Sequence, residues 1–471
     1  MRRSMIFVMA AAVAASGGTL YLGSSAGVAS AAAACAPAWS ATAVYVKDNV
    51  ASQNGHNYTA KWWTQNEAPA THSAQWDVWA DNGVCGGTTT PTTPPATTTP
   101  PTTPPATPPA TPPATPPATT PPPTTQPPTT GIPKRALIGY LHASFANGSG
   151  YLRMADVPSN WDIINLAFGE PTSATSGDIR FTLCPATECP GVESEADFIA
   201  AIRNKRAAGK KVLLSIGGAN GQVQLTTTAA RDKFVSSVSA IIDRYGLDGV
   251  DVDFEGHSLS LNTGDTDFKN PTTPVIVNLI SALKSLKARY GANFVLTMAP
   301  ETFFVQLGYQ YYGSGPWGGQ DPRAGSYLPV IYALRNDLTV LHVQDYNSGS
   351  IMGLDNQYHS MGGADFHIAM TDMLLAGFPV AGNAANAFPA LREDQVGFGA
   401  PASVNAGNGY VAPAAVQQAV GCLVKGTNCG SYTPRSGTNP NLRGLMTWSI
   451  NWDKFAGWEF QNQNGAYFKN Q

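Results

Sequence analysis

The sequence has little charge and no long apolar run that could form a membrane helix. Only 13 % of its 471 residues are charged, and 28 Lys and Arg nearly balance 31 Asp and Glu, for a formal net charge of -3. This balance provides no basic surface for a nucleic-acid backbone, so we expect no nucleic-acid partner. A membrane helix needs about 18 strongly apolar residues in a row, and none occur. The seven histidines lack metal-ligand spacing, and we expect neither a metal nor a cofactor.

The N-terminus has the composition of an export signal. Arg2 and Arg3 precede an apolar stretch from Met5 to Ala15, and small residues follow at positions 29–34. A basic start, an apolar centre and small residues at the end are typical of a secretory signal peptide. We therefore expect residues 1–34 to be removed and the mature protein to be extracellular and free of the membrane, by an export route that the sequence leaves open.

Low complexity marks residues 87–132. This segment is almost wholly Pro, Thr and Ala, so it cannot bury a core. Proline favours an extended backbone, which makes the segment a semi-rigid spacer. It predicts two domains, a small one over residues 35–86 and a large one over residues 133–471.

The six cysteines are distributed in pairs between these two domains. One pair brackets the small domain and two close pairs lie in the large one: Cys35 and Cys85, Cys184 and Cys189, Cys422 and Cys429. In an exported chain, three disulfides paired in this way are the economical interpretation, although the sequence does not fix the connectivity. A zinc site is disfavoured because no histidine pair accompanies the close cysteines.

Aromatic residues are concentrated in the small domain. It holds Trp39, Tyr45, Tyr58, Trp62, Trp63, Trp76 and Trp79. So short a segment cannot bury all these rings, and exposed flat rings suit the apolar faces of sugars. The alternative is a tryptophan-built core closed by one disulfide.

The segment 58–65, with Trp76 and Trp79 and the bracketing cysteines, resembles the chitin-binding modules of carbohydrate-binding families 5 and 12. The resemblance implies a compact, mostly β module that binds insoluble chitin. We expect Tyr58, Trp63 and Trp76 to face the ligand, with Trp62 in the same aromatic set.

In the large domain, short apolar runs alternate with helical patterns. We expect strands at residues 137–141, 163–168, 212–216, 249–254, 294–298, 340–346, 395–399 and 444–449, and helices at residues 198–208, 231–245, 275–290 and 364–376. Eight such units predict an α/β fold, a (β/α)8 TIM barrel, whose site would lie at the carboxyl ends of the strands. We expect a monomer.

Three carboxylates share one face of the fourth expected strand. Alternation places Asp251, Asp253 and Glu255 together, and crowding of buried carboxyls raises at least one pKa. A carboxyl that is protonated near neutral pH can act as a general acid, and Glu255 lies nearest the mouth. A calcium loop is the alternative, but its twelfth position would be Asn262 rather than Glu.

These carboxylates and four other segments resemble the motifs of glycoside hydrolase family 18. The matching segments are residues 248–255, 215–218, 298–301, 344–347 and 446–449, in the family's order. The resemblance implies a substrate-assisted, retaining reaction. Glu255 would protonate the leaving oxygen, Asp253 would orient the substrate's acetamido group, Asp251 would share its proton, and Tyr346 would bond the acetamido oxygen.

The resemblance also implies roles for residues around the carboxylates. Trp448 would form the floor of the sugar site, and Tyr140, Met298, Gln344 and Asn347 would line it. The motif residues Asp248, Ser215, Gly217 and Gly218 would hold the network. Non-proline cis peptides are implied at 167–168 and 448–449.

An open cleft is expected, because no extra domain fits between the seventh and eighth strands, and an open cleft favours internal cuts in chitin. The loop around Tyr311, Tyr312 and Trp317 could add an aromatic subsite. We therefore predict an endo-acting chitinase whose partners are chitin and N-acetylglucosamine oligomers. The alternatives are an endo-β-N-acetylglucosaminidase acting on N-glycans and a chitin-binding lectin without catalysis.

Overall fold

The computed structural model describes residues 33–41, 43–45, 49–61, 64–65, 67–73, 78–86, 131–315 and 319–471. The expected signal peptide and linker lie outside this part of the chain, apart from their edges. Trp62, Trp63, Trp76 and Trp317 also lie outside it.

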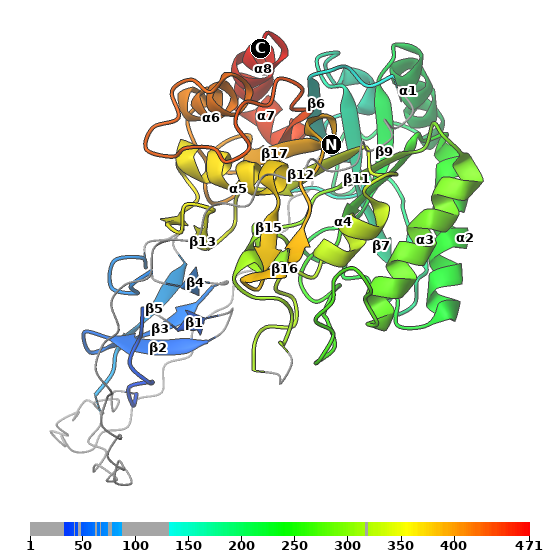
Figure 1. The fold of residues 1–471 in the computed structure, drawn as a ribbon. Coiled ribbons are helices and arrows are strands. Elements are labelled where there is room, and N and C mark those ends of the chain that lie inside the picture. Colours follow the sequence, from blue (N-terminus) through cyan, green and yellow to red (C-terminus); the bar gives the residue numbers. More distant parts are fainter. Residues whose placement is uncertain are drawn as a thin grey trace, which may run out of the picture.

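Eight parallel strands close into a barrel in the large domain (Figure 1). The sheet closes because the first strand pairs with both the last and the second. The barrel strands are β6 (Ala136–His142), β7 (Ile163–Pro171), β9 (Lys211–Gly217), β10 (Gly249–Asp253), β11 (Val295–Met298), β12 (Val340–Gln344), β17 (Val396–Pro401) and β18 (Gly444–Trp448). All eight expected strands are confirmed, and so is the (β/α)8 TIM barrel.

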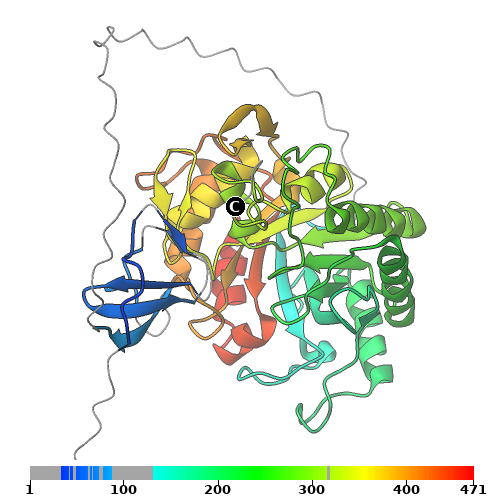
Figure 2. The ribbon, with the colours of Figure 1, turned by 90° about the horizontal axis from the view of Figure 1, so that it is seen from below.

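Helices surround the barrel strands. Seen from below, the early helices lie on one side and the late ones on the other (Figure 2). They are α1 (Glu195–Ala207), α2 (Thr228–Tyr245), α3 (Pro274–Tyr290), α4 (Leu328–Leu334), α5 (Ala364–Ala376), α6 (Pro413–Lys425), α7 (Ile450–Phe455) and α8 (Ala466–Lys469). Local sequence sets their ends: α2 begins where the Thr227 side chain accepts a hydrogen bond from the Ala230 amide and ends at the left-handed Gly246.

Short strands and short helical turns lie in the loops. Small strands are β8 (Ile179–Arg180), β13 (Ile351–Met352), β14 (Tyr358–His359), β15 (Phe378–Val380) and β16 (Asn383–Phe388), and short helical turns are η1 (Met154–Asp156), η2 (Thr302–Phe304), η3 (Gln306–Tyr309), η4 (Glu393–Gln395) and η5 (Phe460–Gly465). The segment between β17 and β18 holds α6 and the Cys422–Cys429 disulfide but no further described sheet or domain. None of the described helices is long and apolar enough to cross a membrane.

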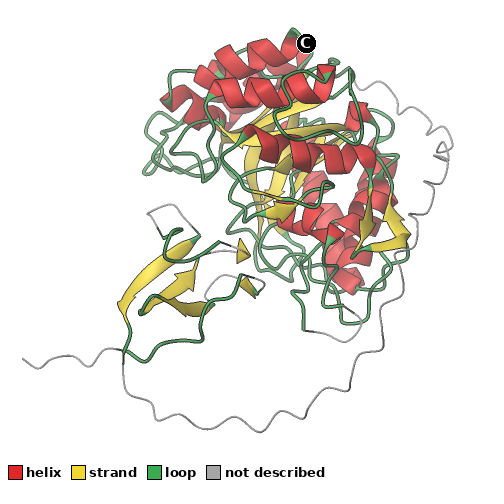
Figure 3. Ribbon diagram, turned by 60° about the vertical axis from the view of Figure 1, so that its left-hand side comes forward, coloured by secondary structure: helices red, strands yellow, loops and turns green. Residues whose placement is uncertain are grey.

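Strand alternation divides the core into two layers. Ile138 and Tyr140 on β6 belong to the cluster inside the barrel, whereas Leu137 and Leu141 pack between the strands and the helices. This alternation gives the barrel its two faces. Figure 3 shows the strands inside and the helices outside. Inward-facing side chains near the carboxyl ends of the strands therefore lie close to the barrel mouth.

The small domain consists of β strands. Its strands are β1 (Val44–Tyr45), β2 (Val50–Gln53), β3 (His56–Ala60), β4 (Thr64–Gln65) and β5 (Trp79–Val84), with β2, β3 and β5 in one antiparallel sheet. The Cys35–Cys85 disulfide closes it, and Cys184–Cys189 is the third disulfide, so the expected pairing is confirmed.

One expectation for this domain is wrong. Tyr58 does not face a ligand, because its side chain is only 4 % exposed and packs with Ala51 and the fully buried Trp79. Trp79 donates its Nε1 hydrogen to the Glu67 carbonyl at 2.8 Å. These two rings form the core that so small a domain requires.

Candidate active site

The fourth barrel strand places three carboxyl groups on the inner face. Asp251 and Asp253 on β10 are 0 % and 3 % exposed, and Glu255 follows the strand at the mouth. The outward residues Val252 and Phe254 pack under the helices. The alternation expected from the sequence is therefore present.

Three hydroxyl groups hold Asp251. Its Oδ2 accepts hydrogen bonds from Tyr140 at 2.9 Å and Ser215 at 2.8 Å, and its Oδ1 accepts one from Thr297 at 2.6 Å. Hydrogen bonds to a carboxylate are stronger than those between neutral groups. The donors come from three different strands, so the barrel itself fixes this side chain.

Asp253 and Glu255 form a hydrogen-bonded acid pair. Burial, with the neighbouring Glu255 and Asp251, raises the pKa of Asp253 well above its ordinary value. Burial also raises the pKa of Glu255, while hydrogen bonds from Gln344 and Asp253 oppose the rise. Two carboxyl groups can bond each other only through a proton, so the pair retains one near neutral pH.

A fourth carboxyl group lies near this pair. Glu301 follows β11, and its backbone forms a bridge with Gln344 on β12. Burial and the neighbouring Glu255 raise the pKa of Glu301 to about 8, while Arg323 opposes the rise. Glu301 belongs to the segment 298–301, but no role was predicted for it, because it lies in a different loop from the carboxylates of β10.

Three nearly parallel aromatic rings lie beside the acids. Trp448 lies 5.6 Å from Phe168 at an angle of 9° and 6.4 Å from Phe145 at 11°, and the two Phe rings are 6.0 Å apart at 2°. The three similar distances exclude a single column, so the rings are stacked with mutual offsets. His142 packs against Phe145 and Trp448, 4.7 Å from each. The apolar ring faces of such a floor suit the face of a sugar ring.

The acids and the floor line one cleft of about 410 Å³ at the barrel mouth. Its described lining residues are Tyr140, Phe145, Ala146, Phe168, Glu170, Ala219, Asn220, Asp253, Glu255, Gln344, Tyr346, Asn347 and Trp448. Of the expected lining residues, Tyr140, Gln344, Asn347 and Trp448 are therefore in place. Both cis peptides, at 167–168 and 448–449, are present.

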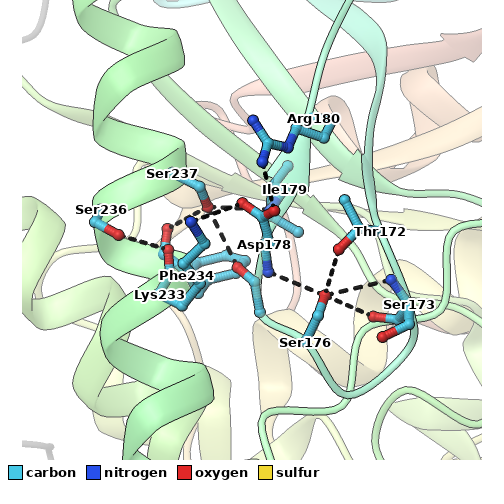
Figure 4. A network of polar contacts seen from close by, with 11 residues as sticks. Thr172, Ser173, Ser176, Asp178, Ile179, Arg180, Lys233, Phe234, Ser236 and Ser237 are labelled. Atoms are coloured by element: carbon cyan, nitrogen blue, oxygen red, sulfur yellow. Dashed lines mark hydrogen bonds and ion pairs between the residues drawn. The ribbon is translucent and has the colours of Figure 1, made fainter.

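The segment after Glu170 is firmly anchored. Asp178 forms ion pairs with Arg180 at 2.7 Å and with Lys233 of α2 at 3.2 Å. Ser237 accepts a hydrogen bond from the Ile179 amide at 3.0 Å. Figure 4 shows this network between the segment and α2. It holds β8 against the end of β7, from which Glu170 enters the cleft.

Position 217, in the segment 215–218, requires a glycine. Gly217 has a φ of +118°, and a Cβ there would lie 2.1 Å from the Asp253 carbonyl oxygen. The following Gly218 donates its amide hydrogen to that carbonyl at 2.8 Å. Close contact between β9 and β10 therefore fixes the backbone of Asp253.

Asp248 lies at the opposite end of β10 from the cleft. It accepts hydrogen bonds from Arg206 of α1 and from the Val212 amide, both at 3.0 Å. It connects β10 to α1 and β9 and does not touch the cleft, whereas the sequence suggested that it would hold the carboxylate network.

Two expectations for the cleft are wrong. Met298 does not line it, because on β11 the inward residue is Thr297 and Met298 packs in the outer layer. Tyr312 does not form an exposed subsite, because it is 3 % exposed and lines a separate cavity with Gln320 and Val380. Tyr311 packs against the outer core and is not part of the cleft lining.

Several residues of the site were not predicted from the sequence. Phe145 and Asn220 line the cleft from loops and Glu170 lines it from the end of β7, and their spacing in the chain shows no pattern. Thr297 on β11 bonds Asp251, and His342 on β12 lies 3.4 Å from it. Inward alternation on β11 and β12 was the one signal that could have found these two.

The arrangement suits acid-catalysed cleavage of a bond held over the floor. Glu255 can donate a proton, and Tyr346, whose pKa is raised well above its usual value by burial and by Asp253 and Glu255, keeps its hydroxyl hydrogen as a donor. Gln344 fixes the acid pair. Among the described residues, no group of His, Cys, Asp and Glu has an arrangement that could hold a metal ion.

The chain is similar in sequence to a known enzyme family and to several known proteins. Residues 136–317 match the model of glycosyl hydrolases family 18. Exochitinase 1 of Streptomyces olivaceoviridis is 77 % identical over 337 residues, which cover 72 % of this chain and 56 % of that protein. An Arthroderma benhamiae protein named "Probable class II chitinase" is 68 % identical over 314 residues, 67 % of this chain and 94 % of its own length.

A solved structure extends the likeness beyond the barrel domain. A family GH18 chitinase from Chromobacterium violaceum is 35 % identical, with a TM-score of 0.64, and the match covers 93 % of this chain and all of that one. The chain spans just over half the length of Exochitinase 1, so the rest of that protein has no counterpart in the match.

Proposed function

Because this chain belongs to glycoside hydrolase family 18, we propose that it is a chitinase, which hydrolyses the β-1,4 linkages between N-acetylglucosamine units. The observation that carries the proposal is the series of the buried Asp251 and Asp253 and the half-buried Glu255, which meets the aromatic floor of Trp448 in one cleft. Relatives that are named chitinases support the substrate.

The proposed reaction is substrate-assisted and retaining. Glu255 protonates the glycosidic oxygen while the substrate's own acetamido oxygen attacks the anomeric carbon, which forms an oxazolinium ion. Asp253 orients the acetamido N–H, Asp251 shares its charge, and Tyr346 donates a hydrogen bond to the acetamido oxygen. Water then attacks the anomeric carbon on the face that the leaving group occupied and gives a proton to the Glu255 carboxylate, while the bond from the acetamido oxygen to that carbon breaks, so the β configuration is kept and the acid is restored.

We propose internal cleavage of the polymer. The described segment between β17 and β18 contains no added domain that would wall the cleft, and an open groove admits a chain at any point along its length. The second candidate is cleavage from chain ends, which the name of the 77 % identical Exochitinase 1 favours. The ratio of viscosity loss to reducing ends released from a soluble chitin derivative distinguishes the two, since internal cuts lower viscosity early.

We also propose export and chitin attachment. Three disulfides fit an oxidising compartment, and the small disulfide-closed β domain would hold the enzyme on insoluble chitin. The support for chitin attachment is the aromatic composition of residues 35–86.

The deciding experiment follows product anomers by NMR during hydrolysis of an N-acetylglucosamine oligomer. Wild type should release β-anomer first, and Glu255→Gln should lower kcat by about 10²–10⁴-fold, because a general acid contributes that much. Glu188→Gln is the matched control, since Glu188 is exposed on the Cys184–Cys189 loop. Initial α-anomer would contradict the retaining reaction. An inactive wild type that still binds chitin would indicate a lectin, and cleavage of N-glycans alone would indicate an endo-β-N-acetylglucosaminidase.

A further inference from the structure

A histidine connects a loop hairpin to helix α5. Strands β13 and β14 pair as a hairpin between β12, which leads into the cleft residues Tyr346 and Asn347, and α5. His359 ends β14, and its side chain is 9 % exposed. It is not part of the cleft lining, and the proposed reaction assigns it no role.

Each ring nitrogen of His359 faces a carboxylate. Nδ1 lies 3.0 Å from Oδ2 of Asp365 in the first turn of α5. Nε2 lies 3.2 Å from Oδ1 and 3.3 Å from Oδ2 of Asp355 in the turn of the hairpin. A neutral imidazole has only one N–H, and an ionised carboxylate only accepts. Both contacts are therefore hydrogen bonds only when both ring nitrogens carry a proton, which makes His359 a cation.

The two aspartates favour this cation. Burial lowers the pKa of His359, but the hydrogen bonds and charges of Asp365 and Asp355 outweigh burial and raise it above its ordinary value of 6.5. The hydrogen bond from His359 in turn lowers the pKa of Asp365, so this carboxylate is ionised near neutral pH. The geometry and the charges therefore agree on an imidazolium between two carboxylates.

The other titratable groups near His359 come from the segment after α6 and from α5. The Tyr432 ring meets the His359 ring edge-on, with centroids 5.3 Å apart at 79°, and its hydroxyl donates to Asp372 at 2.9 Å. Burial and Asp372 raise the pKa of Tyr432, so its hydroxyl stays neutral. Arg435 donates to the Leu354 carbonyl at 3.3 Å. Among these side-chain types, imidazole is the one that titrates near neutral pH.

The remaining contacts of the hairpin are insensitive to this titration. The Tyr309 hydroxyl donates to Asn356 and the Gln310 amide donates to the Tyr358 hydroxyl, both at 3.0 Å. These are neutral groups, and a guanidinium keeps its charge at any pH at which proteins fold. A change of pH near neutrality therefore acts on the hairpin through His359.

We infer that His359 is a pH-sensitive clamp, which in its cationic form bridges Asp355 and Asp365 and so holds the β13–β14 hairpin on α5. Since the folded chain raises the pKa of His359, the clamp stabilises the hairpin fully below about pH 6.5, and this contribution is lost as pH rises through the higher folded-state value. A neutral imidazole can donate to one of the two carboxylates only, and its bare nitrogen then faces the other. The inference does not depend on the proposed hydrolysis.

Hydrogen exchange of the whole protein tests the clamp. After correction for the intrinsic exchange rate at each pH, it measures how often residues 351–359 open. In the wild type, protection of these amides should fall about three- to tenfold between about pH 6 and 9, since a charged hydrogen bond in a partly exposed site is lost. The β15–β16 hairpin, residues 378–388, has no titratable side chain and is the internal control. Constant protection in residues 351–359, or an equal fall in both hairpins, would overturn the inference. This comparison needs no variant.

Three variants assign the effect to the clamp. His359→Gln keeps a donor but cannot gain a charge, so protection should already be low at pH 6 and should not change with pH. Asp365→Asn removes one negative charge, so the fall in protection should begin at lower pH than in the wild type. His257→Gln is the matched control, because His257 is an exposed histidine after β10, and its profile should equal that of the wild type. A wild-type profile in His359→Gln would overturn the inference.

A second readout follows the proton itself. In ¹⁵N-histidine spectra, with His359 assigned by its loss in His359→Gln, both ring nitrogens should carry a proton at about pH 6, and one should be bare above a midpoint that lies higher than about 6.5. In Asp365→Asn this midpoint should move down. A bare ring nitrogen on His359 at pH 6 would overturn the inference.

Discussion

At the residue scale, one amide nitrogen contacts both members of the acid pair, Asp253 and Glu255. Gln344 Nε2 lies 2.8 Å from Asp253 Oδ1, 3.1 Å from Glu255 Oε1 and 2.8 Å from the Ala299 carbonyl oxygen, so its two hydrogens serve three acceptors and one of them is shared. The Ala299 bond fixes the direction of the amide, and the other two stabilise ionised carboxyl groups. Gln344 therefore opposes the rise in the pKa of Glu255 that burial causes.

Replacing Gln344 should change the alkaline limb of the pH profile. Gln344→Met removes the donor, so the carboxylate of Glu255 is less stable and its pKa rises further. The acid then stays protonated to higher pH, and the alkaline limb of kcat/KM should move up by up to about one unit. Gln395→Met is the control, since Gln395 is buried but bonds the Arg335 and Leu338 carbonyls. A downward shift in Gln344→Met would contradict this account.

The ring of Phe145 should contribute to substrate binding. It extends the floor beyond Trp448, so Phe145→Ala should raise KM for an N-acetylglucosamine oligomer about three- to tenfold, the size of an aromatic contact. Steady-state kinetics measures this effect. Phe455→Ala is the control, because Phe455 is 58 % exposed on α7 and is not part of the cleft lining. Equal KM values for Phe145→Ala and wild type would exclude Phe145 from the floor.

At the scale of elements, the spacing between strands limits side-chain size. Gly249 begins β10, and a Cβ there would lie 1.9 Å from the Val295 carbonyl oxygen of β11. Backbone cannot move aside as a flexible side chain can. The two strands therefore approach closely because the residue between them is glycine.

Enlarging this glycine should weaken the barrel. Gly249→Ala should lower the free energy of unfolding by about 1–3 kcal/mol, because the methyl group forces β10 and β11 apart. Urea unfolding followed by tryptophan fluorescence measures the change. Gly148→Ala is the control, since its methyl group would meet only the Trp452 ring at 3.4 Å. Similar urea midpoints for Gly249→Ala and wild type would contradict this account, because they would show that β10 and β11 can move apart with little loss of stability.

At the scale of the whole molecule, the small domain and the barrel have separate cores. Among the described residues, the core of the small domain contains only residues between Trp39 and Trp79, and the barrel clusters contain only residues from Ile132 onward. The Cys35–Cys85 disulfide spans 50 residues of the small domain. Each core therefore depends on its own part of the chain.

Removal of the Cys35–Cys85 disulfide should unfold the small domain alone. Closing a loop of this length stabilises a fold by about 4 kcal/mol in the chain-entropy model, a large share of what so small a core provides. Cys35→Ser with Cys85→Ser should abolish retention on insoluble chitin, while hydrolysis of soluble oligomers stays within about twofold of wild type. Cys422→Ser with Cys429→Ser is the control that should keep retention. Parallel loss of both properties in the first variant would contradict independent cores.

The sequence by itself determined the barrel and its acids. Eight apolar runs, separated by helical patterns, have the right number and order for the fold, because alternation and helical periodicity are local properties of the chain. The same alternation placed Asp251, Asp253 and Glu255 on one face. Tyr140, Gln344 and Trp448 followed from the family resemblance, and the structure places all three in the cleft lining.

Only the tertiary structure decided which side chains come together inside the barrel. Thr297 rather than Met298 faces inward on β11, since the register of a strand depends on its neighbours. Tyr58 is a core residue, because a small domain uses its few large rings for packing first. Phe145 reaches the site from a loop, and no pattern along the chain predicts its place. The alternation of β12 could have placed His342 inside the barrel, but only closure of the sheet brings it near the carboxylates of β10.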